Sequence, residues 1–135
     1  MKIEFALLCD HASVREGMLT LVSAGVDVIN RPSYPAPLGI MFAALISLEP
    51  GEIDREHQIE LRLTRDTGTA IASLSGGFQV VRSDAGPRSG RTPIVADLRN
   101  MIILEPGRYG VTVLLDSRRR ARIDIDARLI HVAQT

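Results

Sequence analysis

The sequence predicts an all-β fold, an antiparallel sandwich of two sheets built as a single domain over residues 1–135. About eight or nine short segments alternate apolar and polar residues with a period of two, and Gly, Pro, Asp and Ser separate them at hairpin spacing. No stretch of ten or more residues has a helical period. A chain of 135 residues buries roughly two-thirds of its unfolded surface, so it folds without disulfides, and it has a single cysteine.

The first third of the chain predicts two strands and an extended connection. Apolar residues alternate from residue 3 to residue 9, and we expect this strand to stop at Asp10–His11, before a polar stretch with at most one helical turn. A second strand is expected over 18–24, continuing past Gly25 to Ile29 through a bulge. Three prolines make residues 30–37 an extended or turning connection.

Residues 38–48 are the most apolar run of the sequence, and both faces of this expected strand are apolar. One face, formed by alternate residues from Leu38 to Leu48, is predicted to point into the core. The second face carries Met41, Ala43 and Leu45. Because a strand of a two-layer sandwich normally exposes one face, this face requires a cover. The cover is either a protein partner or the chain's own loops at 30–37 or 82–92.

The middle of the chain predicts a hairpin and a mobile loop. After a charged turn at 49–56, Ile59, Leu61 and Leu63 are expected to face inward. The residues Asp66-Thr67-Gly68 predict the hairpin turn, and the returning strand is expected to break or bend at Gly76-Gly77. Residues 82–92 are rich in Ser, Gly, Pro and Arg, with little to bury, so we expect a flexible loop before a short strand.

The segment 104–116 predicts a turn followed by a strand in which Tyr109, Val111, Val113 and Leu115 share one face. A turn at 117–120 and a last strand from about residue 121 to residue 132 follow. The string Leu-x-Pro-Gly-x-Tyr-x-Val-x-Val resembles the penultimate strand of immunoglobulin-like and fibronectin-type sandwiches. The resemblance implies an immunoglobulin-like fold in which the Tyr109 hydroxyl bonds back to the upstream backbone. A plain buried aromatic is the alternative.

The N-terminus carries a second resemblance. Residues 4–12, Glu-Phe-Ala-Leu-Leu-Cys-Asp-His-Ala, followed by Gly17-Met18-Leu19, are similar to the start of a family of small bacterial proteins of unknown function. The Pro-Gly-x-Tyr-x-Val-x-Val string near the other end belongs to the same pattern, so the likeness covers the whole chain. Met18 stands where Lys is usual. This resemblance supports the sandwich and implies no catalytic residue.

Composition argues against several classes of partner. Sixteen basic and sixteen acidic residues cancel, and the sequence contains no Trp, so we expect no nucleic-acid partner. No run approaches the ~18 apolar residues that a membrane helix needs, and Glu4 stands where the apolar core of a signal peptide would begin. We therefore expect a cytoplasmic protein with no membrane partner. Cys9 lies among apolar residues, which favours a buried thiol over a nucleophile.

No catalytic, metal-binding or cofactor-binding motif is present. The three histidines, His11, His57 and His131, have no metal-ligand spacing, and the acidic loop at 49–56 lacks the residue order of a calcium loop. Gly-x-Ser-x-Gly and glycine-rich phosphate loops are missing. Asp124 and Asp126 are best explained as surface ion pairs with neighbouring arginines. The sequence thus predicts a protein that is not an enzyme and holds no cofactor or metal.

Two functional hypotheses remain. The first is a protein-interaction or assembly module that binds a partner protein or a second copy, a homodimer for example, through Met41, Ala43 and Leu45. The second is a binder, or a hydrolase, of a small ligand or phosphate group at one end of the sandwich. Its candidate residues are Asp10, His11, the cluster Arg118, Arg119, Arg120 and Arg122, and a second basic group, Arg82, Arg88 and Arg91. A solvated hairpin tip is the alternative for the arginines.

Overall fold

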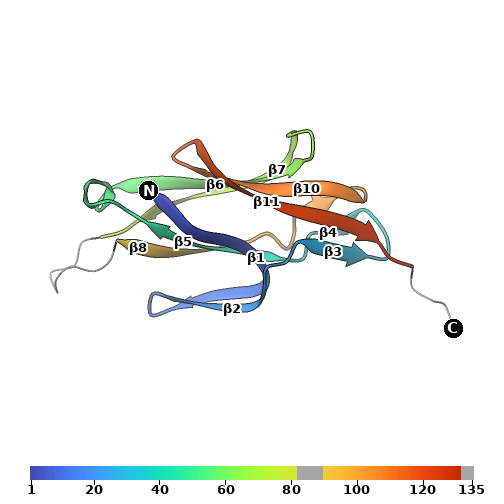
Figure 1. Cartoon of the computed structure of the whole chain (residues 1–135), viewed down its shortest axis with the longest axis horizontal. Helices are drawn as coiled ribbons and strands as arrows, with labels where there is room; N and C mark the ends of the chain where they lie inside the picture. Colours follow the sequence, from blue (N-terminus) through green and yellow to red (C-terminus); the bar gives the residue numbers. More distant parts are fainter. Residues whose placement is uncertain (82–89, 132–135) are drawn as a thin grey trace.

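A computed structural model describes residues 1–81 and 90–131 and shows an all-β protein (Figure 1). Its strands are β1 (Lys2–Arg15), β2 (Met18–Ala24), β3 (Val28–Arg31), β4 (Ala36–Pro37), β5 (Met41–Ser47), β6 (Glu56–Arg65), β7 (Ala70–Gln79), β8 (Arg91–Asp97), β9 (Ile102–Ile103), β10 (Gly107–Leu115) and β11 (Arg118–Leu129). Among these described residues the only helical element is the 3-10 turn Pro50–Glu52, so none of their helices is long enough to cross a membrane.

The strands form two larger sheets that lie over one another (Figure 1). The β5 sheet has the order β2-β1-β5-β8, the β10 sheet has the order β3-β11-β10-β6-β7, and β4 pairs with β9 separately. Among the strands that the structure describes, every pairing is antiparallel except the parallel pair of β3 with β11. The all-β class is therefore confirmed, the purely antiparallel arrangement is corrected at β3, and the immunoglobulin-like arrangement stays a prediction.

One core lies between the two sheets, and period-two alternation builds it. The inward residues of β6 and β10 are the ones that the sequence predicts, and they pack against the predicted face of residues 38–48. The buried set includes Leu38, Ile40, Phe42, Ala44, Ile46, Leu48, Ile59, Leu61, Leu63, Tyr109, Val111, Val113 and Leu115. The sequence predicts these inward faces because every second side chain of each strand is buried, which leaves an alternating pattern of apolar and polar residues.

The first strand does not stop at Asp10–His11. It continues to Arg15, because residues 11–15 pair one by one with β2, from His11 with Val22 to Arg15 with Met18. Glu16 and Gly17 make the turn with positive φ angles of 53° and 74°. We call residues 10–23 the hairpin arm, and Figure 1 shows it turning back below β5 and β8. The local sequence predicts a turn here because neither sheet face of the arm is wholly apolar.

The hairpin arm covers the second apolar face of β5. Met41 is only 7% exposed, Ala43 is fully buried, and Leu45 is half-buried. Ala12 and Leu21 of the arm pack with Met41 and Ala43 in a second, smaller apolar cluster. Met41, Ala43 and Leu45 therefore do not form the exposed stripe that the sequence suggested, and the cover comes from a segment that the sequence did not single out.

Three further boundaries differ from expectation. Residues 26–29 do not continue β2, because the amides of Gly25 and Val26 donate to the Leu8 carbonyl at 2.8 and 3.0 Å and the chain then enters the other sheet as β3. The Gly76-Gly77 pair does not interrupt β7, since both residues pair with β6. Arg91 and Thr92 begin β8, and residues 82–89 of the expected flexible loop lie outside the described residues.

Candidate functional site

A groove separates the free edges of the two sheets where β7 faces β8. It consists of two adjoining hollows of about 430 and 530 Å³ that share Leu74 and Asp97. One wall is β7, from Ile71 to Phe78, and the other wall is β8 with the segment that follows it to Leu104. We call it the β7–β8 groove.

The β7 edge of this groove is unprotected. β7 pairs with β6 on one side only, so its other row of backbone N–H and C=O groups has no strand partner within residues 1–81 and 90–131. Edge strands usually carry charged residues or proline, which block pairing with another chain. The ten residues of β7, Ala-Ile-Ala-Ser-Leu-Ser-Gly-Gly-Phe-Gln, contain neither. In contrast, β8 contains Pro93 and has a charge at each end, Arg91 and Asp97.

The floor of the groove is a part of the core that its own strands leave uncovered. Leu74 lies opposite the buried Leu61 and therefore points inward, yet it is 40% exposed. Gly76 lies opposite Ile59, and a Cβ atom placed there would meet no atom within 4 Å. The groove thus offers an apolar floor with room for inserted side chains beside a free strand edge.

At one end of β7, His57 forms a buried polar network that the sequence analysis missed. Its Nδ1 lies 2.8 Å from the Asp116 carboxylate and its Nε2 lies 2.7 Å from the Glu52 carbonyl oxygen. Both partners only accept hydrogen bonds, so the ring satisfies both when both nitrogens carry protons. The Glu52 carbonyl, and then Asp116, raise the pKa of His57. In the sequence, His57 stands two residues before Ile59 and four before Leu61, so the alternation already places this polar side chain on the inward face of the strand.

Asp116 and Glu52 extend this network to neighbouring elements. The second carboxylate oxygen of Asp116 accepts the Gln58 amide at 2.8 Å. Burial opposes ionisation of Asp116, but the Gln58 amide and His57 outweigh it, so the pKa of Asp116 is lowered. Both Glu52 oxygens lie 2.8 Å from the Met1 amino group. The His57 ring stands 5.6 Å from the ring of Phe78, which lines the groove. The network thus holds His57, the β6 residue that pairs with Phe78 of β7, at one end of the β7–β8 groove.

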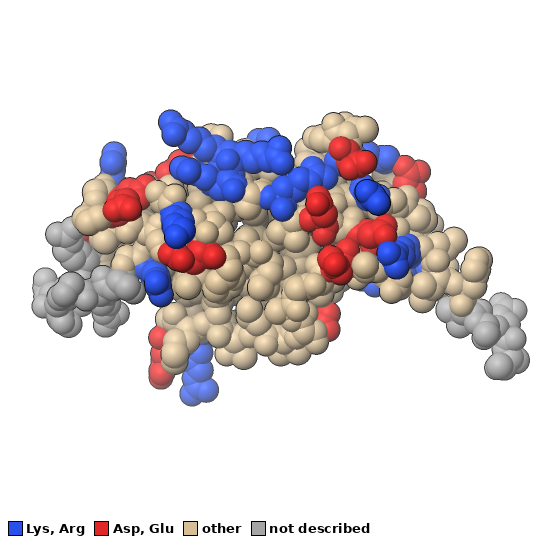
Figure 2. Space-filling view, in the orientation of Figure 1, with Lys and Arg blue, Asp and Glu red and all other residues tan. Residues whose placement is uncertain are grey.

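The predicted arginine cluster is divided by the structure. Arg118, Arg119 and Arg120 are exposed at the start of β11, and no described residue forms an ion pair with them. Arg122 instead lies over Gly110, with its guanidinium 3.0 Å from Asp124 and 3.1 Å from the Thr64 hydroxyl. Figure 2 shows Lys and Arg side chains gathered over the β10 sheet. The expected ion pair of Asp124 with an arginine is confirmed.

The other residues of the ligand hypothesis lie elsewhere. Asp10 and His11 are exposed at the base of the hairpin arm, in the β5 sheet. Arg91 begins β8 in that same sheet, whereas Arg118–Arg120 belong to the β10 sheet. Arg82 and Arg88 lie outside the described residues. Among the described residues, no hydrogen bond or ion pair joins Asp10 or His11 to the arginines of β11.

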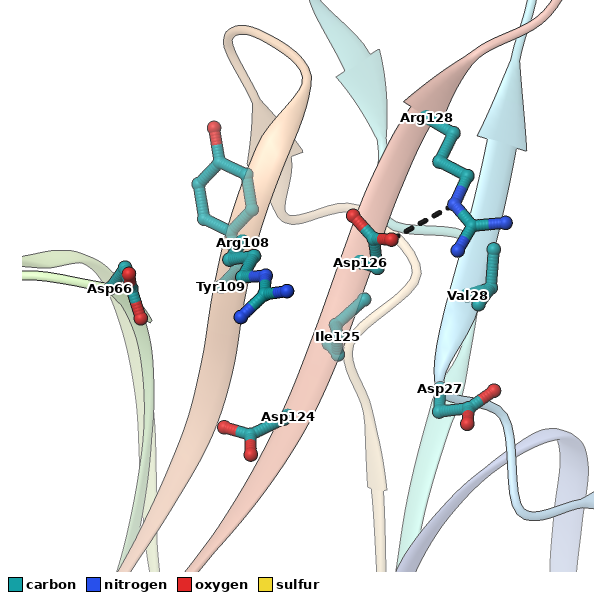
Figure 3. Close-up of a pocket in the computed structure, with 9 residues that line it drawn as sticks. All are labelled: Asp27, Val28, Asp66, Arg108, Tyr109, Asp124, Ile125, Asp126 and Arg128. Carbon is teal, nitrogen blue, oxygen red and sulfur yellow. Dashed lines mark hydrogen bonds and ion pairs between the residues drawn. The ribbon is translucent and has the colours of Figure 1, made fainter.

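A separate polar pocket of about 320 Å³ lies beside β10 and β11 (Figure 3). Its charged residues are Asp27, Asp66, Asp124, Asp126, Arg108 and Arg128. Arg128 is paired with Asp126 at 2.9 Å. Carboxylates outnumber guanidinium groups, so the pocket repels a phosphate group. Within the described residues no group of three or more His, Cys, Asp or Glu side chains is placed to hold a metal ion.

Tyr109 has the contact that the sandwich resemblance implies. Its side chain is buried, and its hydroxyl donates to the Glu105 carbonyl at 2.7 Å, four residues upstream. The bond fixes the chain between the turn at 105–107 and β10. It is a structural contact, and neither Tyr109 nor Glu105 lines the β7–β8 groove.

A family model matches residues 4–128 of this chain. The chain belongs to the family of unknown function DUF6941. A search of curated proteins finds no match. A similar solved structure is the Pseudomonas fluorescens alkylpurine DNA glycosylase AlkC bound to DNA containing an abasic site analog, with 15% sequence identity and a TM-score of 0.43. The likeness covers 91% of this chain and 30% of that one, and it is too low to inform function.

Proposed function

We propose that this protein is a non-enzymatic interaction module that binds an extended segment of another polypeptide along β7, in the β7–β8 groove. The observation that carries the proposal is the free, uncharged edge of β7 beside an apolar floor. Backbone groups of an added strand pair with the edge, and alternate side chains enter the groove. Burying one Val or Leu there contributes about 1.5–3 kcal/mol before ordering costs.

The bound segment is expected to be apolar at alternate positions and to carry no charge at its centre. Side chains that enter the groove meet the apolar Ile59, Leu61, Leu74 and Phe78, and the charged residue shared by both hollows, Asp97, is already paired with Arg99 at 2.8 Å. Residues 82–89, Arg-Ser-Asp-Ala-Gly-Pro-Arg-Ser, lack this alternation, which supports a segment from a second polypeptide. The immunoglobulin-like arrangement, supported by the Tyr109 contact, belongs to this proposal as its scaffold.

A peptide titration followed by NMR tests the proposal. The probe is a capped peptide of alternating Val and Thr, and the control peptide has Pro at every second position, which prevents strand pairing. Binding of the first peptide is expected to shift the amide signals of β7 and β8. Gly76→Leu fills the groove and is expected to abolish the shifts, whereas Ser75→Leu, on the opposite face of β7, is expected to retain them. Shifts that persist in Gly76→Leu, or that never occur, overturn the proposal.

Anion binding at Arg118–Arg120 is the second candidate function. Three exposed arginines without an ion-pair partner among the described residues favour it, because guanidinium groups bind phosphate oxygens in pairs. Titration with pyrophosphate in the same NMR experiment separates it from the first. Saturable shifts at residues 118–120 that disappear in Arg118→Ala with Arg120→Ala support this candidate. Weak, non-saturating shifts exclude it.

A further inference from the structure

The molecule has a second unprotected strand edge, on β2. β2 pairs with β1 on one side only and is the edge of the β5 sheet. Its seven residues, Met-Leu-Thr-Leu-Val-Ser-Ala, contain no charge and no proline. The other edges of the two larger sheets, β3 and β8, both contain arginine. Among the edges of these sheets, therefore, β2 and β7 alone lack the features that prevent pairing with another chain.

One face of β2 packs against its own chain, and the other face is exposed to solvent. Leu21 packs against the cluster that contains Met41, Ala43 and Ala12, which holds the hairpin arm against the β5 sheet. On the opposite face, Met18 is 64% exposed and Val22 is 49% exposed, with Thr20 between them. This face repeats apolar and β-branched residues at every second position. It is the pattern that the floor of the β7–β8 groove accepts.

We infer that the segment that occupies the β7–β8 groove is β2 of a second copy of this chain. The inference rests on the groove function proposed above and names its ligand. β2 pairs with the free edge of β7 in the other copy, and Met18 and Val22 enter the groove near Leu74 and Gly76. Each copy has one hairpin arm and one groove, so two copies bind reciprocally across a twofold axis.

Charge on both surfaces suits this pairing. Neither strand has a charged residue that would be buried between copies, and the formal net charge of the chain is +0 at pH 7, so no overall charge opposes association. Within one copy, the packing of Ala12 and Leu21 on Met41 holds β2 on the outer side of the β5 sheet. The groove of the same copy is lined by β7 and β8, not by the arm. We therefore expect β2 to enter the groove of another copy and not the groove of its own copy.

The test is molar mass by light scattering across a concentration series, with two single variants and their mixture. Val22→Asp places a carboxylate on the exposed face of the arm, and Leu74→Asp places one in the groove. The native protein is expected to dimerise. Each variant is expected to raise the dissociation constant by about 100-fold, because a carboxylate in an apolar contact is desolvated without a partner. Thr67→Asp, in the exposed β6–β7 turn, is the matched control and is expected to dimerise normally.

Mixing the variants distinguishes this pairing from any other. The intact arm of Leu74→Asp meets the intact groove of Val22→Asp, so the equimolar mixture is expected to form dimers at concentrations at which neither variant does. A pairing of β7 with β7, or of β2 with β2, is not rescued by mixing. Circular dichroism verifies the fold of each variant. If either unfolds, Thr20→Asp replaces the arm variant and Gly76→Leu replaces the groove variant.

The outcomes separate this inference from the function on which it rests. A native protein that stays monomeric, or dimers that survive both variants, overturn the inference. Loss of dimers in Leu74→Asp alone also overturns it, because the groove then binds a different segment. In each case, NMR shifts of β7 with the alternating peptide leave the groove function standing. Absence of those shifts in Val22→Asp, whose groove is intact and not filled by a second copy, overturns the groove function itself.

Discussion

The two sheets meet along two seams that differ in how well they are closed. On one side β1 and β11 lie close together, and the residues between them, such as Leu8, Ile125 and Ala127, are almost wholly excluded from water. On the other side β7 and β8 leave the β7–β8 groove, where Leu74 is 40% exposed. We call the first the closed seam and the second the open seam. Both border the same core.

The sequence of the edge strands explains the difference. At the closed seam, β1 and β11 present large aliphatic residues to the core, and Val26 and Ile29 add to them. At the open seam, β7 presents Ala72 and Gly76 at inward positions, and Ile59, opposite Gly76, lines the groove. Small residues therefore keep the open seam accessible. Regions with little buried apolar surface contribute little to stability, so they are free to bind another chain.

The largest expected effect comes from truncating one leucine at each seam and comparing the two losses in the free energy of unfolding. Leu8→Ala is expected to lower the free energy of unfolding by about 2–5 kcal/mol, because Leu8 is fully buried and its removal leaves a cavity. Leu74→Ala is expected to cost less than about 1 kcal/mol, because water already reaches that side chain. Chemical denaturation of both variants gives the two values. Equal costs would mean that the open seam is as well packed as the closed seam.

A pH titration of stability examines the network at the end of the open seam. The pKa of His57 is raised in the folded state by the Glu52 carbonyl and Asp116. A raised folded pKa adds stability that is fully present below the ordinary value of about 6.5 and is lost as the pH rises through the folded value. The free energy of unfolding is therefore expected to fall above pH ~6.5. Asp116 has a lowered pKa, so its contribution disappears only in acid.

The His57→Gln variant isolates this contribution. Below pH ~6 it is expected to be less stable than the native protein by about 1–3 kcal/mol, since the charged hydrogen bonds to Asp116 and the Glu52 carbonyl are lost. Above the folded pKa of His57 the difference is expected to shrink. Denaturation midpoints of both proteins across this pH range measure it. A difference that does not change with pH would show that the ring is not charged in the folded protein.

Local alternation made much of the fold predictable from the sequence. The inward faces of β6 and β10, the hairpin turn at 66–68 and the extent of β2 follow from residues that are neighbours along the chain. The turn before β11 was placed too late, because Asp116 and Ser117 adopt positive φ angles of 49° and 67° that non-glycine residues seldom show.

The parts that escaped prediction depend on contacts between distant residues. The parallel pairing of β3 with β11 joins residues 28–31 to residues 126–129, and no local pattern encodes it. The hairpin arm covers Met41 by bringing Ala12 and Leu21 against it, although these residues lie 20 or more positions away along the chain. The β7–β8 groove arises where β7 and β8 fail to meet, although its chemical signal, ten residues without charge or proline, was visible in the sequence.

The smallest expected effect is also the one that most directly ties the open seam to binding. Gly76→Val places a β-branched side chain at an inward position of β7 where a Cβ meets no atom within 4 Å. It is expected to raise the free energy of unfolding by up to about 1 kcal/mol, because glycine weakens a strand and the new side chain covers the core. Gly77→Val is the matched control: its Cβ would lie 3.0 Å from the Glu56 carboxylate, so no gain is expected.

If Gly76→Val is more stable yet binds the alternating peptide less well, then the glycine at the open seam lowers stability where the protein binds its partner. A Gly76→Val protein that gains no stability would mean instead that the open seam is already filled.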